Sequence, residues 1–361
     1  MVCATENGVK QLGEWLVNHF HKILFSICLV TVSLLSSCTA VHAPAPVSPL
    51  APVSGLKPVA GQVKANGMTI AYERFGAPVD ETILLIAGTG MQLVDWPMEL
   101  ITALVQRGYQ VVCFDNRDIG RSTKLTEAGL PDSASIEKAL KASAPPPLPY
   151  TVRDMAADAV GLLDALNIQQ AHLVGISMGG AIAQLVAIDF PERTRSLTLL
   201  MADPGDPALP VIAKPEAFKD VPPQPQTGDR AAYIEWQVKT WQALAGPDYP
   251  TDEVTLRAGA ARDFTRGYDF AGFTRQATAI LVERYTNPPY RLNHLKTIKA
   301  PTVILQGEAD PIVPVSAAKE LAAQIAGADL RLIPGLGHDT PVALASTFAD
   351  AIIAAARRAK P

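Results

Sequence analysis

Short, nearly continuous apolar segments alternate along most of the chain with longer segments in which apolar residues recur every three to four positions. Segments of the first kind have the length of buried strands, and those of the second kind have the period of amphipathic helices. Strands are therefore expected at 82–87, 110–114, 171–176, 196–201, 301–306 and 329–333. Helices are expected at 98–107, 152–166, 178–189, 315–325 and 341–357. The alternation predicts an α/β fold with a mostly parallel, doubly wound sheet covered by helices on both faces.

The sheet should begin with an antiparallel pair of strands. Residues 63–75 alternate between apolar and polar around Asn66-Gly67, a dipeptide that readily adopts the positive φ values of a two-residue hairpin turn. We therefore expect the globular domain to begin near Val63.

The strand and helix alternation is interrupted once. Residues 204–299 contain Pro-rich segments and three helical stretches with aromatic residues, but no clear strand. We interpret them as a helical cap inserted into an α/β core, whose first part is 63–203 and whose second part is 300–361.

The N-terminal residues have a different pattern. The apolar run 23–35 follows Lys22 and is shorter than the roughly 20 residues that a membrane-spanning helix requires. It ends in LSSC, which resembles the bacterial lipobox, in which the cysteine is acylated and becomes the first residue. We interpret residues 1–38 as a lipoprotein signal with lipidation at Cys38. An ordinary secretory signal is the alternative interpretation.

Residues 39–62 are rich in Ala, Pro, Val and Ser, and prolines disfavour both helices and central strands. This composition is typical of a tether between a lipid anchor and a globular domain. Thr39 follows the cysteine, where an aspartate is associated with retention in the inner membrane of two-membrane bacteria. We expect a location in the bacterial cell envelope, on the periplasmic side of the outer membrane, with Cys38 as the membrane attachment.

Composition narrows the possible partners. The 361 residues carry a formal net charge of −4 with acidic and basic residues interspersed, so no basic face for nucleic acid is expected. Of the four cysteines, only Cys38 and Cys113 lie beyond the cleavage site, and we expect Cys113 to be a small buried apolar residue in a strand. No disulfide framework is predicted.

The strongest local signal for chemistry is the sequence GISMGG at 175–180, which contains the pattern G-x-S-x-G. It lies between an expected strand and an expected helix, where a tight turn can lift the Ser177 hydroxyl out of the sheet. Gly175 and Gly179 leave room for the close backbone approach that such a turn requires. We predict that Ser177 is a nucleophile.

A serine hydroxyl needs a base within hydrogen-bond reach. Beyond the signal, the histidines are His42, His172, His294 and His338. His338 follows the last expected strand in a glycine-rich loop, at the carboxyl end where open α/β sheets place their ligands. We predict that His338 is the base and that the other three are structural.

The base must be held in one tautomer by an acid. Asp310 follows the strand at 301–306 and is the preferred candidate. Glu308 in the same loop and Asp203 at the end of the preceding strand are the alternatives. For both, stabilisation of a turn is favoured over a catalytic role.

Two backbone N–H groups should bind the oxyanion that forms when an acyl carbonyl is attacked. Met178, the residue after the nucleophile, supplies the first. The loop AGTG at 87–90 follows an expected strand, so the N–H of Thr89 is the natural second donor.

Together with the segment DNRDIGRS at 115–122, these motifs resemble the α/β-hydrolase family over residues 63–361. The chain order Ser, Asp, His is the order of that family. The combination of AGTG, Trp96-Pro97, DNRDIGRS and GISMGG looks most like the aclacinomycin methylesterase group of carboxylic ester hydrolases. The resemblance implies a small-molecule substrate, a methyl or other small alkyl ester. Many hydrolases of this fold have His-Gly where this chain has Ala87-Gly88, so a side chain that braces the loop is missing.

The expected chemistry is acyl transfer through a covalent acyl-enzyme, without a metal ion or an organic cofactor, since no phosphate or dinucleotide loop is found. Apolar residues beside the site are weak candidates for substrate binding, because aromatic residues at helical spacing more often pack together. These candidates are Met91, Trp96, Trp236, Trp241 and Phe270.

Three other functions stay open at this point. A peptidase of the prolyl aminopeptidase type and a cofactor-free haloperoxidase use the same triad, although no acidic clamp for an amino group is evident. A catalytically silent binding module is the non-enzymatic alternative, because a fold does not determine a function.

Overall fold

The structure is a computed structural model that describes residues 55–359, except 227 and 287. The expected signal, the lipidation site at Cys38 and the first part of the expected tether lie outside the described residues. None of the described helices has both the length and the apolar character needed to cross a membrane.

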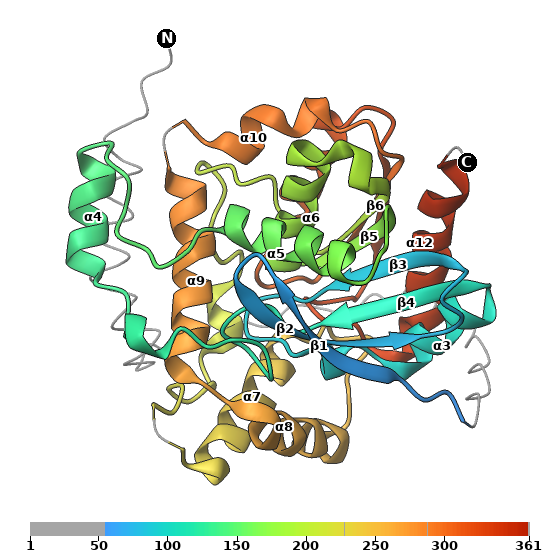
Figure 1. The fold of residues 1–361 in the computed structure, drawn as a ribbon. Coiled ribbons are helices and arrows are strands. Elements are labelled where there is room, and N and C mark those ends of the chain that lie inside the picture. Colours follow the sequence, from blue (N-terminus) through green and yellow to red (C-terminus); the bar gives the residue numbers. More distant parts are fainter. Residues whose placement is uncertain (1–54, 227, 287, 360–361) are drawn as a thin grey trace, which may run out of the picture.

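A single eight-stranded sheet forms the centre of the molecule (Figure 1), with the strand order β1-β2-β4-β3-β5-β6-β7-β8. The strands are β1 Val59–Ala65, β2 Met68–Phe75, β3 Glu81–Ile86, β4 Tyr109–Phe114, β5 Ala171–Ile176, β6 Thr194–Leu200, β7 Thr302–Gly307 and β8 Asp329–Ile333. The first two strands pair antiparallel, and all pairs from β4 to β8 are parallel. The predicted α/β fold with a mostly parallel sheet is confirmed.

The sheet begins earlier than the expected Val63. Val59 pairs with Arg74, and Gln62 pairs with Ala71, so four residues assigned to the tether belong to β1. The residues before Val63 contain little apolar pattern because this edge strand is largely exposed, and pattern alone therefore missed its start.

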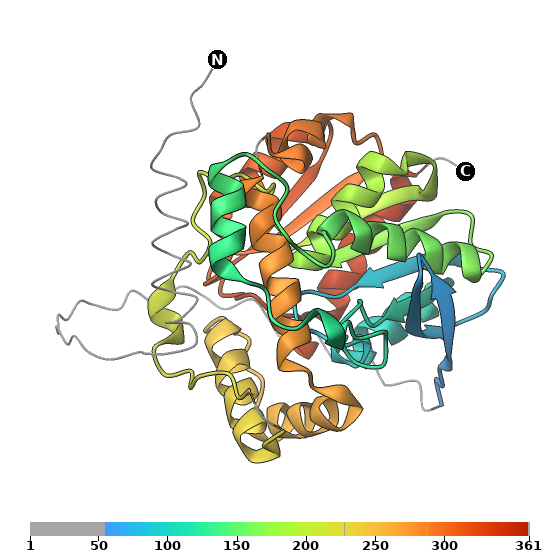
Figure 2. The same ribbon diagram turned by 60° about the vertical axis from the view of Figure 1, so that its left-hand side comes forward.

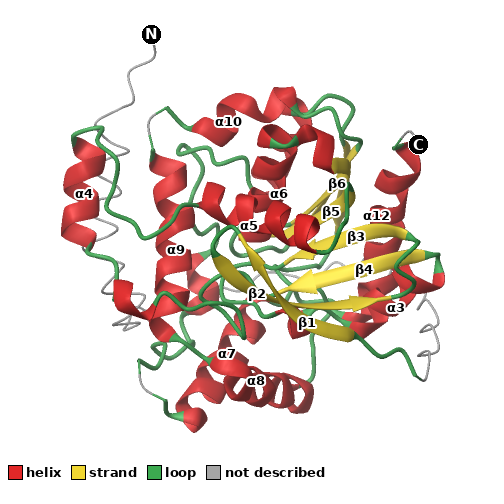
Figure 3. Cartoon of the chain, viewed as in Figure 1, coloured by secondary structure: helices red, strands yellow, loops and turns green. Residues whose placement is uncertain are grey.

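Helices cover both faces of the sheet, as Figure 3 shows. The helices of the core are α3 Met98–Gln106, α4 Ser133–Lys141, α5 Val152–Ala165, α6 Met178–Asp189, α11 Val315–Gln324 and α12 Ala345–Arg358. Helices α5, α6 and α11 contribute to the apolar core on one face, and α3 and α12 to the core on the other. Helix α4 was not predicted, since one buried residue, Ile136, leaves a weak apolar pattern.

Among the described residues between β6 and β7, four α-helices occupy the region expected to form the cap (Figure 2). They are α7 Arg230–Leu244, α8 Glu253–Gly267, α9 Phe270–Tyr285 and α10 Tyr290–His294. Helices α7 and α8 pack on each other, α9 contacts α5, and α10 contacts α6. The described residues of this region form no strand.

Candidate active site

Ser177 lies on the turn between β5 and α6 and has φ 54° and ψ −122°, a conformation that non-glycine residues rarely adopt. Its neighbours on both sides are buried, whereas Ser177 is partly exposed. A Cβ atom on Gly175 would lie 2.1 Å from the carbonyl oxygen of Gly179, and one on Gly179 would lie 2.0 Å from that of Ile86. Glycine is therefore required at both positions, and the turn presents the serine as the sequence predicts.

The loop after β3 lies directly against this turn. A Cβ atom on Gly88 would be 3.3 Å from the Cβ atom of Ser177. Neither the N–H of Thr89 nor that of Met178 donates a hydrogen bond to another described residue. Met178 follows Ser177 in the chain, and Thr89 follows Gly88, which packs on Ser177. Met178 is also the first residue of α6, where the positive end of the helix dipole favours negative charge.

His338 and Asp310 are in contact and nearly buried, with 7% and 2% of their surface exposed. His338 Nδ1 lies 2.8 Å from Asp310 Oδ2. The carboxylate accepts a hydrogen bond from the Nδ1–H group, which places the ring proton on Nδ1. The Nε2 atom then keeps its lone pair and can act as a base.

The carboxylate of Asp310 is fixed from several sides. Its Oδ1 atom accepts hydrogen bonds from the backbone N–H groups of Ile312 and Val313, at 2.8 and 2.9 Å. Its Oδ2 atom accepts a further one, at 2.9 Å, from Nε2 of Gln306, a fully buried residue of β7 that the sequence analysis did not identify. A Cβ atom on Gly307 would lie 2.3 Å from the carbonyl oxygen of Leu336, so the two loops that carry the acid and the base are closely packed.

The alternative acids have other surroundings. Asp203 accepts hydrogen bonds from Arg284 and Arg291, at 3.1 and 3.3 Å. Burial alone would raise the pKa of Asp203, but the two guanidinium groups outweigh it and hold the pKa below its usual value. Glu308 is exposed. Asp310 is therefore the candidate acid that contacts His338.

Asp339, next to His338, is a second buried carboxyl group. Burial raises its pKa to about 7, His338 opposes that shift, and the negative charge of Asp310 adds to it. Its Oδ1 atom is buried and has no hydrogen-bond partner among the described residues. The sequence offered no signal for this environment, because burial of a loop carboxyl depends on packing.

The other described histidines are engaged elsewhere. His172 Nδ1 lies 2.9 Å from Ser196 Oγ, and His294 Nδ1 lies 2.7 Å from the carbonyl oxygen of Tyr290. His42 lies outside the described residues. Cys113 is a buried free thiol whose pKa is raised by burial, in keeping with the expected apolar role.

The candidate substrate-binding residues are largely packed into the protein. Trp236 contacts an aromatic cluster that includes Tyr233 and Phe273, and Phe270 is also buried. Trp96 and Trp241 pack with the apolar core beside α3 and α12. Of the five, Met91 lies against the loop after β3, because its Sδ atom would lie 3.2 Å from a Cβ atom on Gly88.

Two residues of the segment DNRDIGRS hold neighbouring parts of the chain, Asp115 two loops and Arg117 helix α5. Asp115 accepts hydrogen bonds from the backbone N–H groups of Leu93 and Arg121, both at 2.8 Å. Arg117 forms a buried ion pair with Asp158 at 2.6 Å. Asp115 therefore fixes two loop positions, and Arg117 ties its own loop to α5.

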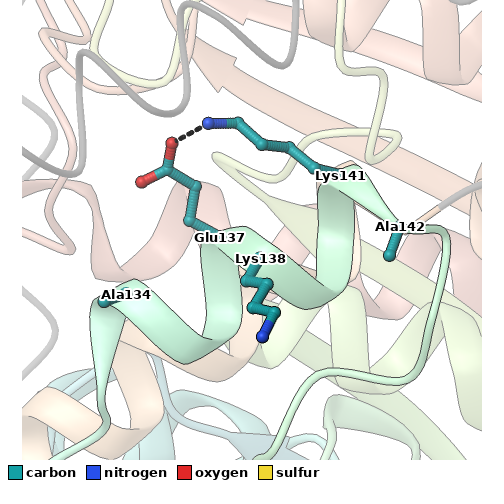
Figure 4. Close-up of a pocket in the computed structure, with 5 residues that line it drawn as sticks. All are labelled: Ala134, Glu137, Lys138, Lys141 and Ala142. Carbon is teal, nitrogen blue, oxygen red and sulfur yellow. Dashed lines mark hydrogen bonds and ion pairs between the residues drawn. The ribbon is translucent and has the colours of Figure 1, made fainter.

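A shallow hollow on α4 lies apart from these residues (Figure 4). It is lined by Ala134, Glu137, Lys138, Lys141 and Ala142, and an ion pair joins Glu137 to Lys141. No candidate catalytic residue contributes to it. In the part of the chain that the structure describes, no cluster of three or more metal-ligand side chains is found.

Comparison with known proteins gives consistent matches. A family model described as the alpha/beta hydrolase fold matches residues 81–342. The chain is 31% identical to rhodomycin D methylesterase of Streptomyces peucetius over 313 residues, which cover 81% of this chain and 96% of that protein. It is 28% identical to a putative carbamate hydrolase of Variovorax paradoxus over 283 residues, covering 78% and 93%.

Solved structures show the same fold. A bacterial membrane phospholipase A superposes with a TM-score of 0.59 at 21% identity, over 84% of this chain and 87% of that chain. An enzyme that degrades N-acyl homoserine lactones gives a TM-score of 0.58 at 24% identity, over 81% and 99%.

Proposed function

The chain belongs to the α/β-hydrolase fold family, and from that premise we propose that it is a serine hydrolase that cleaves a carboxylic ester through Ser177, His338 and Asp310. The observation that carries the proposal is the buried pair of His338 and Asp310, 2.8 Å apart. This pair follows β7 and β8, and Ser177 follows β5, so all three lie beyond the carboxyl ends of parallel strands of one sheet.

In the proposed mechanism, Ser177 Oγ attacks the ester carbonyl while its proton passes to His338 Nε2. The negative charge that forms on the carbonyl oxygen is bound by the N–H groups of Met178 and Thr89. The imidazolium then gives the proton to the departing alcohol, which leaves an acyl-enzyme. Water attacks that intermediate with the same base and releases the acid.

The proposed substrate is a methyl or other small alkyl ester. Support comes from the relatives named rhodomycin D methylesterase, which match this chain along nearly their whole length. A relative from Rhodococcus erythropolis at 26% identity is named a non-heme haloperoxidase, so halogenation is included among the outcomes to be tested.

The test is hydrolysis of a panel of p-nitrophenyl esters, methyl esters and aminoacyl arylamides by the full chain, together with a halogenation assay, with Ser177→Ala as the control. We expect ester cleavage that falls by several orders of magnitude in the variant, to a residual level of ~10³ to 10⁴ over the water reaction. Near wild-type turnover by Ser177→Ala would refute the proposal. Cleavage of arylamides alone would indicate a peptidase, and halogenation without ester cleavage would indicate a haloperoxidase.

We also propose, from the sequence of residues 1–38, that Cys38 is acylated and anchors the enzyme in the bacterial cell envelope. Metabolic labelling with a radioactive fatty acid tests this directly. We expect label in the wild-type chain and none in Cys38→Ala, and equal labelling of the two would refute the anchor.

A further inference from the structure

Gln276, on cap helix α9, joins two loops of the core. Its side chain is fully buried. Its Oε1 atom accepts a hydrogen bond of 2.9 Å from the N–H of Gly90, and its Nε2 atom donates one of 2.7 Å to the carbonyl oxygen of Arg117. One amide therefore holds both the loop after β3 and the loop after β4. The carboxyl ends of these two strands point toward α9 in Figure 1.

Phe273, three residues earlier on the same face of α9, makes a second contact with the loop after β3. This loop, residues 87–90, is named the oxyanion loop because it carries the proposed donor Thr89. Gly90 has φ +74°, and a Cβ atom on it would lie 2.5 Å from Cδ2 of Phe273. The ring thus packs directly on the α-carbon of Gly90. The loop is held by a hydrogen bond and by packing at the same residue.

Helix α9 is itself fixed to the core at the adjacent position. Arg275 forms two hydrogen bonds of 2.8 Å with the carboxylate of Asp118, and both side chains are fully buried. A Cβ atom on Gly272 would lie 2.4 Å from the carbonyl oxygen of Asp118. Helix α9 therefore rests against the core without room for a side chain, and Gln276 is held in place with it.

The residues on either side of Thr89 are consequently fixed by different parts of the chain. Asn116 of the core donates a hydrogen bond of 3.0 Å to the carbonyl oxygen of Ala87, and Gly88 packs against Ser177. Gly90 is held by the cap. Thr89 lies between these two fixed positions, so contacts from both the core and the cap determine the direction of its N–H group.

We propose that Gln276 is a positioning residue for the oxyanion loop, so that the cap takes part in building the active site. The inference rests on the proposed function, because the direction of the Thr89 N–H affects catalysis if that group binds a developing negative charge. Gln276 acts through Gly90 and does not touch the substrate.

The first measurement is the steady-state kinetics of Gln276→Leu, which keeps the size of the side chain and removes both hydrogen bonds. We expect kcat to fall about 10- to 100-fold with little change in KM, because misplaced donors weaken binding of the transition state more than binding of the ester. A trifluoromethyl ketone provides a second readout. Its carbonyl carbon bonds to Ser177 Oγ, the Oγ proton passes to His338, and its oxygen becomes an alkoxide, so its inhibition constant should rise in parallel with the loss of kcat.

Gln184→Leu is the matched control. Gln184 is also a fully buried glutamine that joins core and cap, through hydrogen bonds with Asp203 and Arg291, but it does not contact the oxyanion loop. We expect it to lower the melting temperature while kcat stays within about threefold of the wild type. Gln276→Asn, whose shorter side chain cannot make both contacts, replaces Gln276→Leu if the latter does not fold.

Hydrogen exchange of the peptide that covers residues 88–93 separates this inference from the proposed function. Exchange should accelerate in Gln276→Leu and not in Gln184→Leu, whether or not the wild-type chain cleaves esters. Unchanged exchange, or unchanged kcat in a wild-type background that is active, would overturn the positioning role. Absence of ester cleavage by the wild type with faster exchange in Gln276→Leu would refute the esterase proposal and leave the support of the loop intact.

Discussion

The backbone N–H of His338 donates a hydrogen bond of 2.8 Å to the carbonyl oxygen of Leu244, the last residue of cap helix α7. The segment that follows α7 packs closely on the loop of the candidate base. A Cβ atom on Gly337 would lie 2.1 Å from the carbonyl oxygen of Leu244, and one on Gly246 would lie 1.9 Å from that of Gly335. The cap therefore contacts the backbone of the base as well as the oxyanion loop.

This close packing predicts that Gly246→Ala lowers activity. The added methyl group has no space unless residues 335–337 move, and such a movement shifts His338 relative to Ser177. We expect kcat/KM to fall about 10-fold or more, since small displacements of catalytic groups have large effects. Gly259→Ala on α8 is the control, because a Cβ atom there meets nothing closer than 4.0 Å. That variant should keep full activity and gain about 0.5–1 kcal/mol of stability, and a similar loss of activity in both variants would contradict the argument.

The different surroundings of Asp310 and Glu308 predict different effects of substituting them. Asp310→Asn should lower kcat by about 10³- to 10⁴-fold, because an amide that donates to His338 favours the wrong tautomer. Glu308→Gln should change kcat little, since its side chain is exposed. Steady-state assays of both variants on the preferred ester give the comparison. Equal losses, or a larger loss in Glu308→Gln, would show that the acid is not Asp310.

The sheet, the turn at Ser177 and the loops of Asp310 and His338 could be predicted because each depends on local sequence. Apolar segments mark buried strands, and a polar residue directly after such a strand lies at the edge where parallel sheets place their sites. Gln276 could not be identified in this way. It is an ordinary residue in a cap helix, and the loop residue that it contacts lies 186 positions away in the chain.

Gln306 and the start of β1 could not be predicted for the same reason. Gln306 lies in an apolar strand. Its hydrogen bond to Asp310 forms when the loop after β7 folds back onto the strand. The early start of β1 at Val59 depends on pairing with β2 rather than on its own pattern. Long-range packing, and not local preference, decides each of these features.

Asp339 predicts a pH dependence of stability. Its pKa is about 7 in the folded protein, against about 3.9 for an unperturbed aspartate. Between these values Asp339 binds more protons in the folded state than in the unfolded state. Its contribution therefore makes the free energy of unfolding fall as the pH rises, and this contribution is constant above pH ~7. Asp339→Asn removes this loss. We expect the variant to gain on the order of 1–3 kcal/mol relative to wild type between pH ~5 and ~8.

Urea unfolding at several pH values in this range measures the difference. Glu308→Gln serves as the control, because it removes an exposed carboxylate from a neighbouring loop and should follow the wild-type curve. A difference between Asp339→Asn and wild type that does not vary with pH would contradict the assigned ionisation.

The buried ion pair of Arg275 and Asp118 predicts a strong effect on the cap. Arg275→Leu leaves the carboxylate of Asp118 buried without its partner, which should cost about 3–5 kcal/mol of stability. Adding Asp118→Asn removes that isolated charge, and we expect the double variant to recover part of the loss. Because Gln276 is the next residue on α9, Arg275→Leu should also lower kcat, and the double variant should not restore it, since the anchor of the helix is still missing. Urea unfolding and ester hydrolysis measured on both variants separate the effect on stability from the effect on kcat. Recovery of kcat in parallel with stability would show that the ion pair of Arg275 and Asp118 contributes to folding alone.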